Sequence, residues 1–145
     1  MPQEDEQSVT LEVVGRKAYL TLNRPDRLNA ITHEVAAEIK AAVDRANEDP
    51  QVHVIVVQGA GRAFSAGYDL HRYAEEGVSV QPPVWDPIQD YQMMKSNTDN
   101  FFSLWRSLKP TIAKVRGYAV AGGSDIALSC DLVVLAEDAR SGYMR

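Results

Sequence analysis

The chain has 145 residues, 45% of them hydrophobic, and its 15 basic and 20 acidic side chains give a formal net charge of −5. This length suits one domain over residues 1–145, and the acidic balance without a sustained basic run argues against a nucleic-acid partner. The longest apolar run, LVVLA at 132–136, is too short to span a membrane, and the polar start together with the single Cys130 predicts a cytoplasmic protein.

Two β-rich runs open the chain, VTLEVV at 9–14 and KAYLTL at 17–22. The Gly15-Arg16 pair between them suits a hairpin turn, so we expect antiparallel neighbours. The segment NRPDRLNA at 23–30 predicts a loop, because proline cannot donate to a strand ladder. Thr32 is expected to cap a helix that ends near Asp49-Pro50 and whose apolar residues recur at helical spacing: Val35, Ile39, Ala42, Val43 and Ala46.

The run VHVIVVQG at 52–59 is typical of a strand buried on both faces, and the glycine-rich segment GAGRAFSAGYDL at 59–70 follows it. Residues 73–87 lack periodicity and contain four glycine and proline breakers, which predicts a mobile surface loop or lid. A second long helix is expected before Pro110. Its large apolar stripe is predicted to face the core: Tyr91, Met94, Thr98, Phe101, Trp105 and Leu108.

The last part of the chain repeats this order of elements. TIAKV at 111–115 predicts a strand, VAGGSD at 120–125 a tight turn into a short buried helix, and DLVVLAE at 131–137 another buried strand. The sequence strand, glycine-rich loop, helix therefore occurs twice, around 59–70 and around 117–129.

Three kinds of site fit the first glycine-rich segment poorly: a dinucleotide-binding loop, a serine nucleophile and a metal site. GAGRAF lacks the third glycine of a dinucleotide fingerprint, since Phe64 stands there. AFSAG at 63–67 misses the nucleophile elbow by one glycine and no histidine follows in the required order, so we expect Ser65 to hydrogen-bond within a turn, with a Ser65 hydrolase as the second hypothesis. The three histidines lack ligand spacing, and we expect no metal site.

A fourth chemistry uses the main chain. The loops SAGYD at 65–69 and VAGGSD at 120–125 each follow a strand, and glycines there let N–H groups point into a concavity. Such donors stabilise the oxyanion that forms when a thioester carbonyl becomes enolate-like, with no side-chain nucleophile. We therefore predict an oxyanion-binding site with one N–H from each loop.

Four segments resemble the crotonase superfamily, the enoyl-CoA hydratase and isomerase family, in the family's order: LNRPDRLNA at 22–30, GRAFSAGYDL at 61–70, KPTIAKVRGYAVAGGSDIALSCDLVV at 109–134 and AEDARSGY at 136–143. The resemblance implies an α/β fold, a crotonase-like spiral of repeated β-β-α units, in a domain whose C-terminal part is lacking here. It also implies a homotrimer or hexamer and an acyl-CoA thioester substrate, with coenzyme A as part of the substrate and no separate cofactor.

The resemblance assigns roles to particular residues. It places the oxyanion donors at the N–H groups of Tyr68 and Gly122, and Asp125 where hydratases carry a first catalytic glutamate, although Asp125 also suits an N-cap. The position of the second glutamate holds Arg145, which cannot act as a general acid. Substrate contacts are expected at Arg27, Leu28, Asn29, Ala30, Ala66, Asp69 and Leu70, and the cations nearest to the phosphates are expected to be Arg24, Arg27, Arg62 and Arg72.

The leading function is therefore an enoyl-CoA hydratase of fatty acid metabolism, which adds water to a 2-enoyl-CoA through an enolate held in the oxyanion hole. Because only one carboxylate is in place, other functions stay open: an enoyl-CoA double-bond isomerase, an acyl-CoA thioester hydrolase and a non-catalytic CoA-binding relative.

Overall fold

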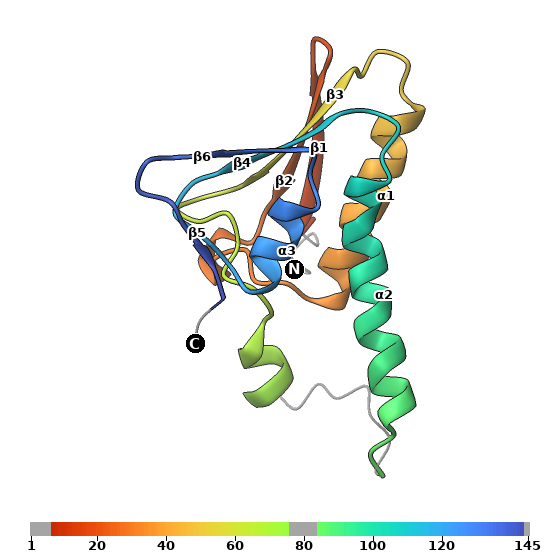
Figure 1. Ribbon diagram of the computed structural model, residues 1–145, viewed down its shortest axis with the longest axis vertical. Coiled ribbons are helices and arrows are strands. Elements are labelled where there is room, and N and C mark those ends of the chain that lie inside the picture. Colours follow the sequence, from red (N-terminus) through yellow and green to blue (C-terminus); the bar gives the residue numbers. More distant parts are fainter. Residues whose placement is uncertain (1–6, 76–83, 144–145) are drawn as a thin grey trace, which may run out of the picture.

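The computed structural model describes residues 7–75 and 84–143 (Figure 1). Its elements follow one another as β1 (Val9–Val14), β2 (Lys17–Leu22), the 3₁₀ turn η1 (Pro25–Arg27), α1 (His33–Glu48), β3 (Val54–Gly59), the π-helical turn η2 (His71–Glu75), α2 (Pro87–Trp105), β4 (Thr111–Val115), β5 (Tyr118–Val120), α3 (Gly122–Leu128), β6 (Leu132–Leu135) and β7 (Arg140–Gly142). The predicted strands and helices are thus present in the predicted order.

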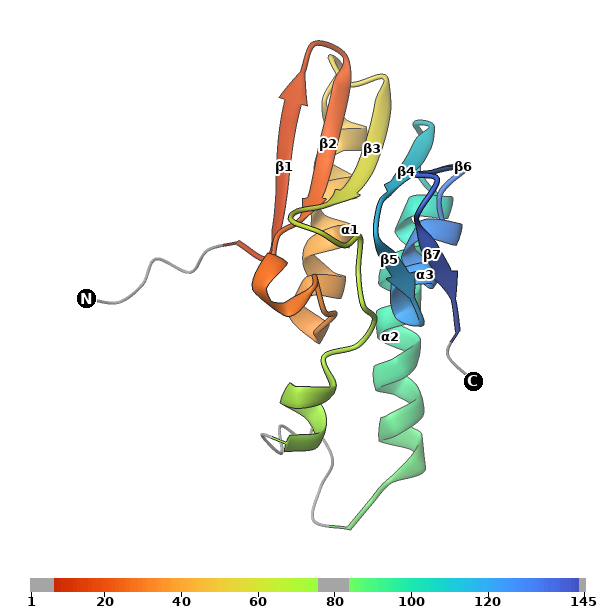
Figure 2. The same ribbon diagram turned by 90° about the vertical axis from the view of Figure 1, so that its left-hand side faces the viewer.

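Two sheets organise the chain. The larger has the order β1-β2-β3-β4-β6, in which β1 and β2 are antiparallel and every later pair is parallel. The smaller pairs β5 with β7 and lies beside α3, on the far side of the molecule from β1 (Figure 2). A bridge between Ser65 and Ala119 extends this smaller sheet. The chain thus passes from β3 in the large sheet to Ser65 beside the small sheet, and again from β4 in the large sheet to β5 in the small sheet. This repetition is the predicted β-β-α spiral.

Local sequence accounts for the N-terminal elements. Gly15 has φ +60°, which suits the hairpin turn between β1 and β2. The Thr32 hydroxyl accepts a hydrogen bond from the Val35 N–H at 3.3 Å, so it caps α1 as predicted. The apolar face predicted for α1 is buried against the sheet.

The core lies between the large sheet and the helices α1 and α2. Leu20, Ile55 and Val57 contribute from β2 and β3, and Ile39 and Val43 contribute from α1. In β3 the consecutive residues 55–57 are all buried, which confirms a strand covered on both faces. Burying one such aliphatic side chain stabilises the fold by about 1.5–3 kcal/mol.

The prediction that the large apolar stripe of α2 faces the core was wrong. Tyr91, Met94 and Trp105 are 63%, 42% and 65% exposed, and Leu108 lies beyond the helix at 88%. Phe101 is the one large apolar member of the stripe that is buried, together with two residues outside the stripe, Asn97 and Leu104. The reason is that α1 and α3 cover only one narrow side of α2, whose first turns extend beyond the body of the molecule (Figure 1).

The prediction that 131–137 forms a buried strand was half right. Residues 132–135 form β6, but Leu132, Val133, Val134 and Leu135 are 60%, 38%, 58% and 53% exposed. In the described residues β6 is the edge of the large sheet and is hydrogen-bonded only to β4. An apolar run predicts the strand because of its composition, but burial depends on a neighbouring layer.

The loop expected at 73–87 lies partly outside the described residues, which omit 76–83. Its start is helical, since residues 71–75 form η2, and Pro87 already begins α2 behind its cap, Asp86. Among the helices of the described residues, none is long and apolar enough to cross a membrane.

Candidate active site

The loop 65–69 is held on both sides by main-chain hydrogen bonds. On one side the Ile31 N–H donates to the Gly67 carbonyl at 2.8 Å, and the Asp69 N–H donates to the Ile31 carbonyl at 2.9 Å. On the other side Ser65 exchanges hydrogen bonds of 2.9 and 3.1 Å with β5. The N–H of Tyr68, which lies between Gly67 and Asp69, takes part in none of these hydrogen bonds.

The two glycine-rich loops are in contact. Gly67 has φ +91°, and a Cβ on Gly67 would lie 3.0 Å from the Val120 carbonyl oxygen and 3.6 Å from the Gly122 nitrogen. A Cβ on Gly122 would lie 3.0 Å from Cε2 of Tyr68. Within residues 7–75 and 84–143, neither the Tyr68 N–H nor the Gly122 N–H donates to a hydrogen-bond acceptor. The structure thus brings together the two loops predicted to carry the oxyanion donors; their role in binding an oxyanion stays a prediction.

A strained residue sets the position of Gly122. Ala121 has φ +48° and ψ −125°, a conformation that alanine rarely adopts, and its N–H donates to the Gly142 carbonyl at 3.0 Å. The Ala121 carbonyl accepts from the Ser124 N–H at 2.8 Å. Gly122 is therefore the first residue of α3, where a helix provides no acceptor for its N–H.

Asp125 lies one turn further along α3 and is partly buried. Its carboxylate accepts a hydrogen bond from the Tyr143 hydroxyl. The alternative role of an N-cap was wrong, because α3 is capped at Ala121 without any side-chain hydrogen bond. Asp125 lines a cavity of about 300 Å³ between α2 and α3, with Thr98, Phe101, Phe102, Leu128 and Ser129. Sequence reasoning gave no site role to Tyr143 or Phe102 and placed Thr98 and Phe101 in a core-facing stripe, since nothing local in the sequence connects them to Asp125.

The Tyr68 side chain stands beside this carboxylate. Burial raises the pKa of the Tyr68 hydroxyl above its ordinary value; the nearby Asn97 side chain lowers it, and the negative charge of Asp125 raises it further. The Tyr68 hydroxyl is therefore neutral at physiological pH.

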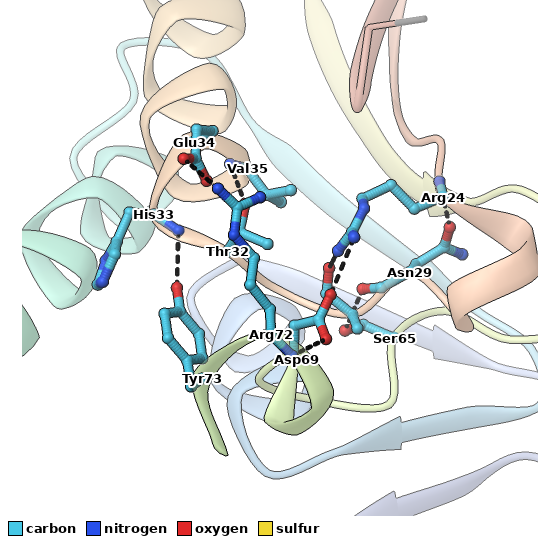
Figure 3. A network of polar contacts seen from close by, with 11 residues as sticks. Arg24, Asn29, Thr32, His33, Glu34, Val35, Ser65, Asp69, Arg72 and Tyr73 are labelled. Carbon is cyan, nitrogen blue, oxygen red and sulfur yellow. Dashed lines mark hydrogen bonds and ion pairs between the residues drawn. The ribbon is translucent and has the colours of Figure 1, made fainter. Parts of the chain in front are cut away.

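The loop 23–30 is tied together by two side chains (Figure 3). The Arg24 guanidinium donates to the Asp69 carboxylate at 2.9 Å and to the Ala30 carbonyl at 2.6 Å. The Asn29 carboxamide accepts from the Arg24 N–H at 2.8 Å and donates to two carbonyls, those of Ala60 and Ala63, at 2.9 Å each. The side chains of Asn29 and Asp69, both predicted substrate contacts, are thus engaged within the protein.

Asp69 is ionised in this setting. Burial by itself raises its pKa, but hydrogen bonds from the Arg72 N–H and the Arg24 guanidinium, and the charges of Arg24 and Arg27, outweigh burial. The net effect is an Asp69 pKa below its usual value, so the carboxylate and Arg24 form a partly buried ion pair that joins the two loops.

The other predicted substrate contacts lie around this ion pair. Arg27 is exposed in η1, and Leu70 is 73% exposed at the start of η2. Leu28 has φ +51°, and its carbonyl accepts from the Ala66 N–H at 2.9 Å, which joins the two predicted binding segments. Ala30 is buried. All of these residues belong to one continuous region beside the first glycine-rich loop, and their contact with substrate stays a prediction.

A polar cluster between α1 and α2 was also missed. His33 Nδ1 lies 2.9 Å from the Asn97 side-chain oxygen, and the His33 main-chain N–H donates to the Tyr73 hydroxyl at 3.1 Å. In the described residues His33 Nε2 and Asn97 Nδ2 are buried without a partner, beside a cleft of about 760 Å³. The pair is separated by 64 residues, so no sequence pattern reveals it.

Side-chain nucleophiles and metal ligands find little support in the described part of the chain. Cys130 is buried, and burial raises its thiol pKa to about 12, which keeps it protonated. No group of three or more His, Cys, Asp and Glu residues between 7–75 and 84–143 is arranged to hold a metal ion. The expected absence of metal stays a prediction.

Ser65 is fully buried, and its hydroxyl donates to the Asn29 carbonyl at 2.9 Å and accepts from the Gly67 N–H at 3.2 Å. This confirms the expected turn role. Ser65→Ala should therefore lower the free energy of unfolding by about 1–2 kcal/mol through the lost hydrogen bonds while thioester turnover persists. Denaturant unfolding and steady-state rates check this, and labelling of Ser65 by a fluorophosphonate would contradict it.

Comparison with known proteins agrees with this geometry. The family model "Enoyl-CoA hydratase/isomerase" matches residues 15–145. The crystal structure of an enoyl-CoA hydratase from Mycobacterium smegmatis is 45% identical and superposes with a TM-score of 0.83, over 94% of this chain and 49% of that one.

Two further relatives give the same result. The structure of an enoyl-CoA hydratase/isomerase from Xanthobacter autotrophicus Py2 is 37% identical with a TM-score of 0.85, over 94% of this chain and 48% of that chain. The (E)-benzylidenesuccinyl-CoA hydratase of Thauera aromatica is 36% identical over 135 residues, which is 92% of this chain and 49% of the relative. The chain spans about half the length of the relatives that it matches. From its sequence and its crotonase fold, the chain belongs to the enoyl-CoA hydratase/isomerase family.

Proposed function

We propose that the protein is an enoyl-CoA hydratase, which adds water across the double bond of a 2-enoyl-CoA through an enolate. One observation carries the proposal: two glycine-rich loops touch, and each presents a main-chain N–H without an acceptor in the described residues. Such donors suit a thioester oxygen that gains negative charge.

The oxyanion hole in this proposal consists of the N–H groups of Tyr68 and Gly122. Both positions are held before substrate arrives, Tyr68 by the hydrogen bonds of its neighbours to Ile31, and Gly122 by the strained Ala121. Loss of one preorganised donor of this kind raises the barrier by about 3 kcal/mol.

Asp125 is the proposed general base for water. It lies in the same short helix as Gly122, three residues later, and lines the cavity between α2 and α3. A carboxylate there can accept a proton as the water oxygen attacks the double bond. Three of the six residues that line the cavity are large and apolar, Phe101, Phe102 and Leu128, which suits the acyl chain rather than the nucleotide.

Coenzyme A is the proposed recognition element, as part of the substrate and without a further cofactor. The binding region comprises the seven residues predicted from the sequence: Arg27, Leu28, Asn29, Ala30, Ala66, Asp69 and Leu70. Arg27 and Arg62 are exposed and have no ion-pair partner among the described residues, which suits contact with phosphates. Asn29 and Asp69 contribute by shaping the loops, because their side chains bond within the protein.

A homotrimer or hexamer is also proposed. Large apolar side chains exposed on β6 and at the C-terminal end of α2 support it, since another subunit could cover them: Phe102, Trp105, Leu108, Leu132, Val133, Val134 and Leu135. A cytoplasmic location and a role in fatty acid metabolism belong to the same proposal, the former supported by the single buried cysteine.

The test uses the intact protein with crotonyl-CoA and acetoacetyl-CoA. We expect loss of the enoyl-thioester absorbance, formation of 3-hydroxybutyryl-CoA, and saturable binding of acetoacetyl-CoA by calorimetry. No binding at millimolar ligand would defeat the proposal. A shifted double bond in the product would favour the isomerase instead, and free CoA thiol would favour the thioester hydrolase.

A further inference from the structure

The hydrogen bond between Tyr143 and Asp125 is built into the spiral. Tyr143 directly follows β7, whose last residue, Gly142, pairs in register with Val120 of β5. The Ala121 N–H then donates to the Gly142 carbonyl at 3.0 Å, so the turn that leads into α3 and the residue before Tyr143 are joined. The pairing of β5 with β7 thus delivers the Tyr143 hydroxyl to the Asp125 carboxylate, 18 residues away in sequence.

Hydration requires two proton transfers, one away from water and one to carbon. A single carboxylate has to perform both, or a second group has to supply the proton. The Tyr143 hydroxyl is such a group, since it donates a hydrogen bond to Asp125. The Tyr68 hydroxyl is a second candidate, because the charge of Asp125 contributes to its raised pKa. The pKa of the Tyr68 hydroxyl responds to Asn97 as well as to Asp125, whereas the Tyr143 hydroxyl is hydrogen-bonded to Asp125 directly.

We propose, on the basis of the proposed hydratase function, that Tyr143 is the proton donor to C2 of the substrate and that Asp125 is its partner base. Asp125 takes a proton from water as the water oxygen bonds to C3, and the electrons of the double bond move into the enolate. The enolate then forms a C–H bond at C2 with the Tyr143 proton, and the thioester carbonyl reforms. The Tyr143 phenolate regains a proton from Asp125 along their hydrogen bond. One water is consumed for each double bond, and nothing is oxidised or reduced.

The state of Tyr143 suits a donor. Its hydrogen bond to Asp125 and, to a lesser extent, burial and the charge of Asp125 raise the pKa of the Tyr143 hydroxyl above its ordinary value, against a smaller opposing hydrogen bond with Ser124. The hydroxyl therefore keeps its proton at neutral pH, in contact with the carboxylate that replenishes it. Its side chain is 66% exposed, so substrate has access and removal of the hydroxyl leaves the core intact.

The first measurement compares crotonyl-CoA hydration by wild type, Tyr143→Phe and Asp125→Asn in the intact protein. Both substitutions should lower kcat by about 100-fold or more, with KM within about threefold. The matched control is Tyr118→Phe, a partly exposed tyrosine on β5 whose hydroxyl has no hydrogen-bond partner in the described residues. The control should retain turnover within about twofold.

The second measurement separates proton donation from orientation of Asp125. Butyryl-CoA cannot add water, but its C2 proton exchanges with D₂O through the same enolate, which mass spectrometry detects. Loss of exchange in Tyr143→Phe supports donation by Tyr143. Exchange near the wild-type rate in this variant overturns the proposal, because Asp125 then reaches C2 unaided. Wild type that neither hydrates nor exchanges would instead refute the hydratase function.

Thermal unfolding shows whether Tyr143→Phe is folded. A third measurement tests the proposal even if that variant is misfolded. Incorporation of 3,5-difluorotyrosine at position 143 retains the hydroxyl and lowers its pKa. The alkaline limb of kcat/KM should then move to lower pH than in wild type. An unmoved limb would contradict a proton-donating Tyr143.

Discussion

Gly123→Ala is expected to lower kcat for 2-enoyl-CoA hydration about 100- to 1,000-fold. A Cβ on Gly123 would lie 2.5 Å from the Ser65 carbonyl oxygen and 2.9 Å from the Ser65 Cβ. The first of these atoms is main chain, so the substitution has to push the two glycine-rich loops apart. The N–H groups of Tyr68 and Gly122 would then no longer point to one oxygen position, and overpacking should also lower the free energy of unfolding by about 3 kcal/mol.

Steady-state kinetics and denaturant unfolding measure the two effects of Gly123→Ala. The matched control is Gly15→Ala, at a residue with φ +60° where a Cβ would meet no atom within 4 Å. The control should cost about 1 kcal/mol of stability for the left-handed conformation and leave turnover unchanged. Wild-type kcat in a folded Gly123→Ala variant would contradict the oxyanion role of the two loops.

Arg24→Met is expected to lower the free energy of unfolding by about 3–5 kcal/mol at pH 7. The Asp69 carboxylate is 6% exposed and the Arg24 side chain 21%, so the substitution leaves an unpaired carboxylate that is almost fully buried. It also removes the hydrogen bond to the Ala30 carbonyl. Addition of Asp69→Asn to this variant should restore part of the stability, because the charge is then absent.

The stability contributed by Asp69 should depend on pH in a definite direction. Its pKa is lowered in the folded protein, so its contribution is present above the unfolded pKa of about 3.9 and is lost as pH falls through the folded pKa. Urea unfolding at pH 7 and at successively lower pH should show the stability difference between wild type and Arg24→Met shrinking in acid. The exposed Arg27→Met serves as control and should change stability by about 0.5 kcal/mol or less. Equal stability of wild type and Arg24→Met at pH 7 would refute the role of the ion pair.

The predicted elements that agreed with the structure depend on residues close together in the chain. Gly15 allows the β1–β2 turn, and the Thr32 hydroxyl caps α1 by accepting from the N–H of Val35, three residues later. Apolar residues that alternate or recur at helical spacing mark the strands and α1. The two glycine-rich loops were also visible, because glycines after strands form a local pattern. Residues 76–83, in the middle of the loop predicted at 73–87, lie outside the described residues, as does Arg145, which occupies the position of the second catalytic glutamate.

The predictions that failed concern surfaces rather than elements. The apolar residues of α2 and β6 specify a helix and a strand, but which side is buried depends on the elements packed against them. The resemblance also implied substrate contacts at Asn29 and Asp69, which stay a prediction; the structure adds that their side chains hold the loops together.

By itself, therefore, the sequence determined the order of strands and helices, the family and the two glycine-rich loops. Periodicity, caps and turns act over a few residues, and the order of the motifs identifies the family. Only the tertiary structure decided that these loops touch, that Arg24 neutralises Asp69 and that Tyr143 bonds to Asp125. The physical reason is distance along the chain: the two ion-pair partners are 45 residues apart and the proposed proton-transfer pair 18, so each contact exists only once the spiral has closed.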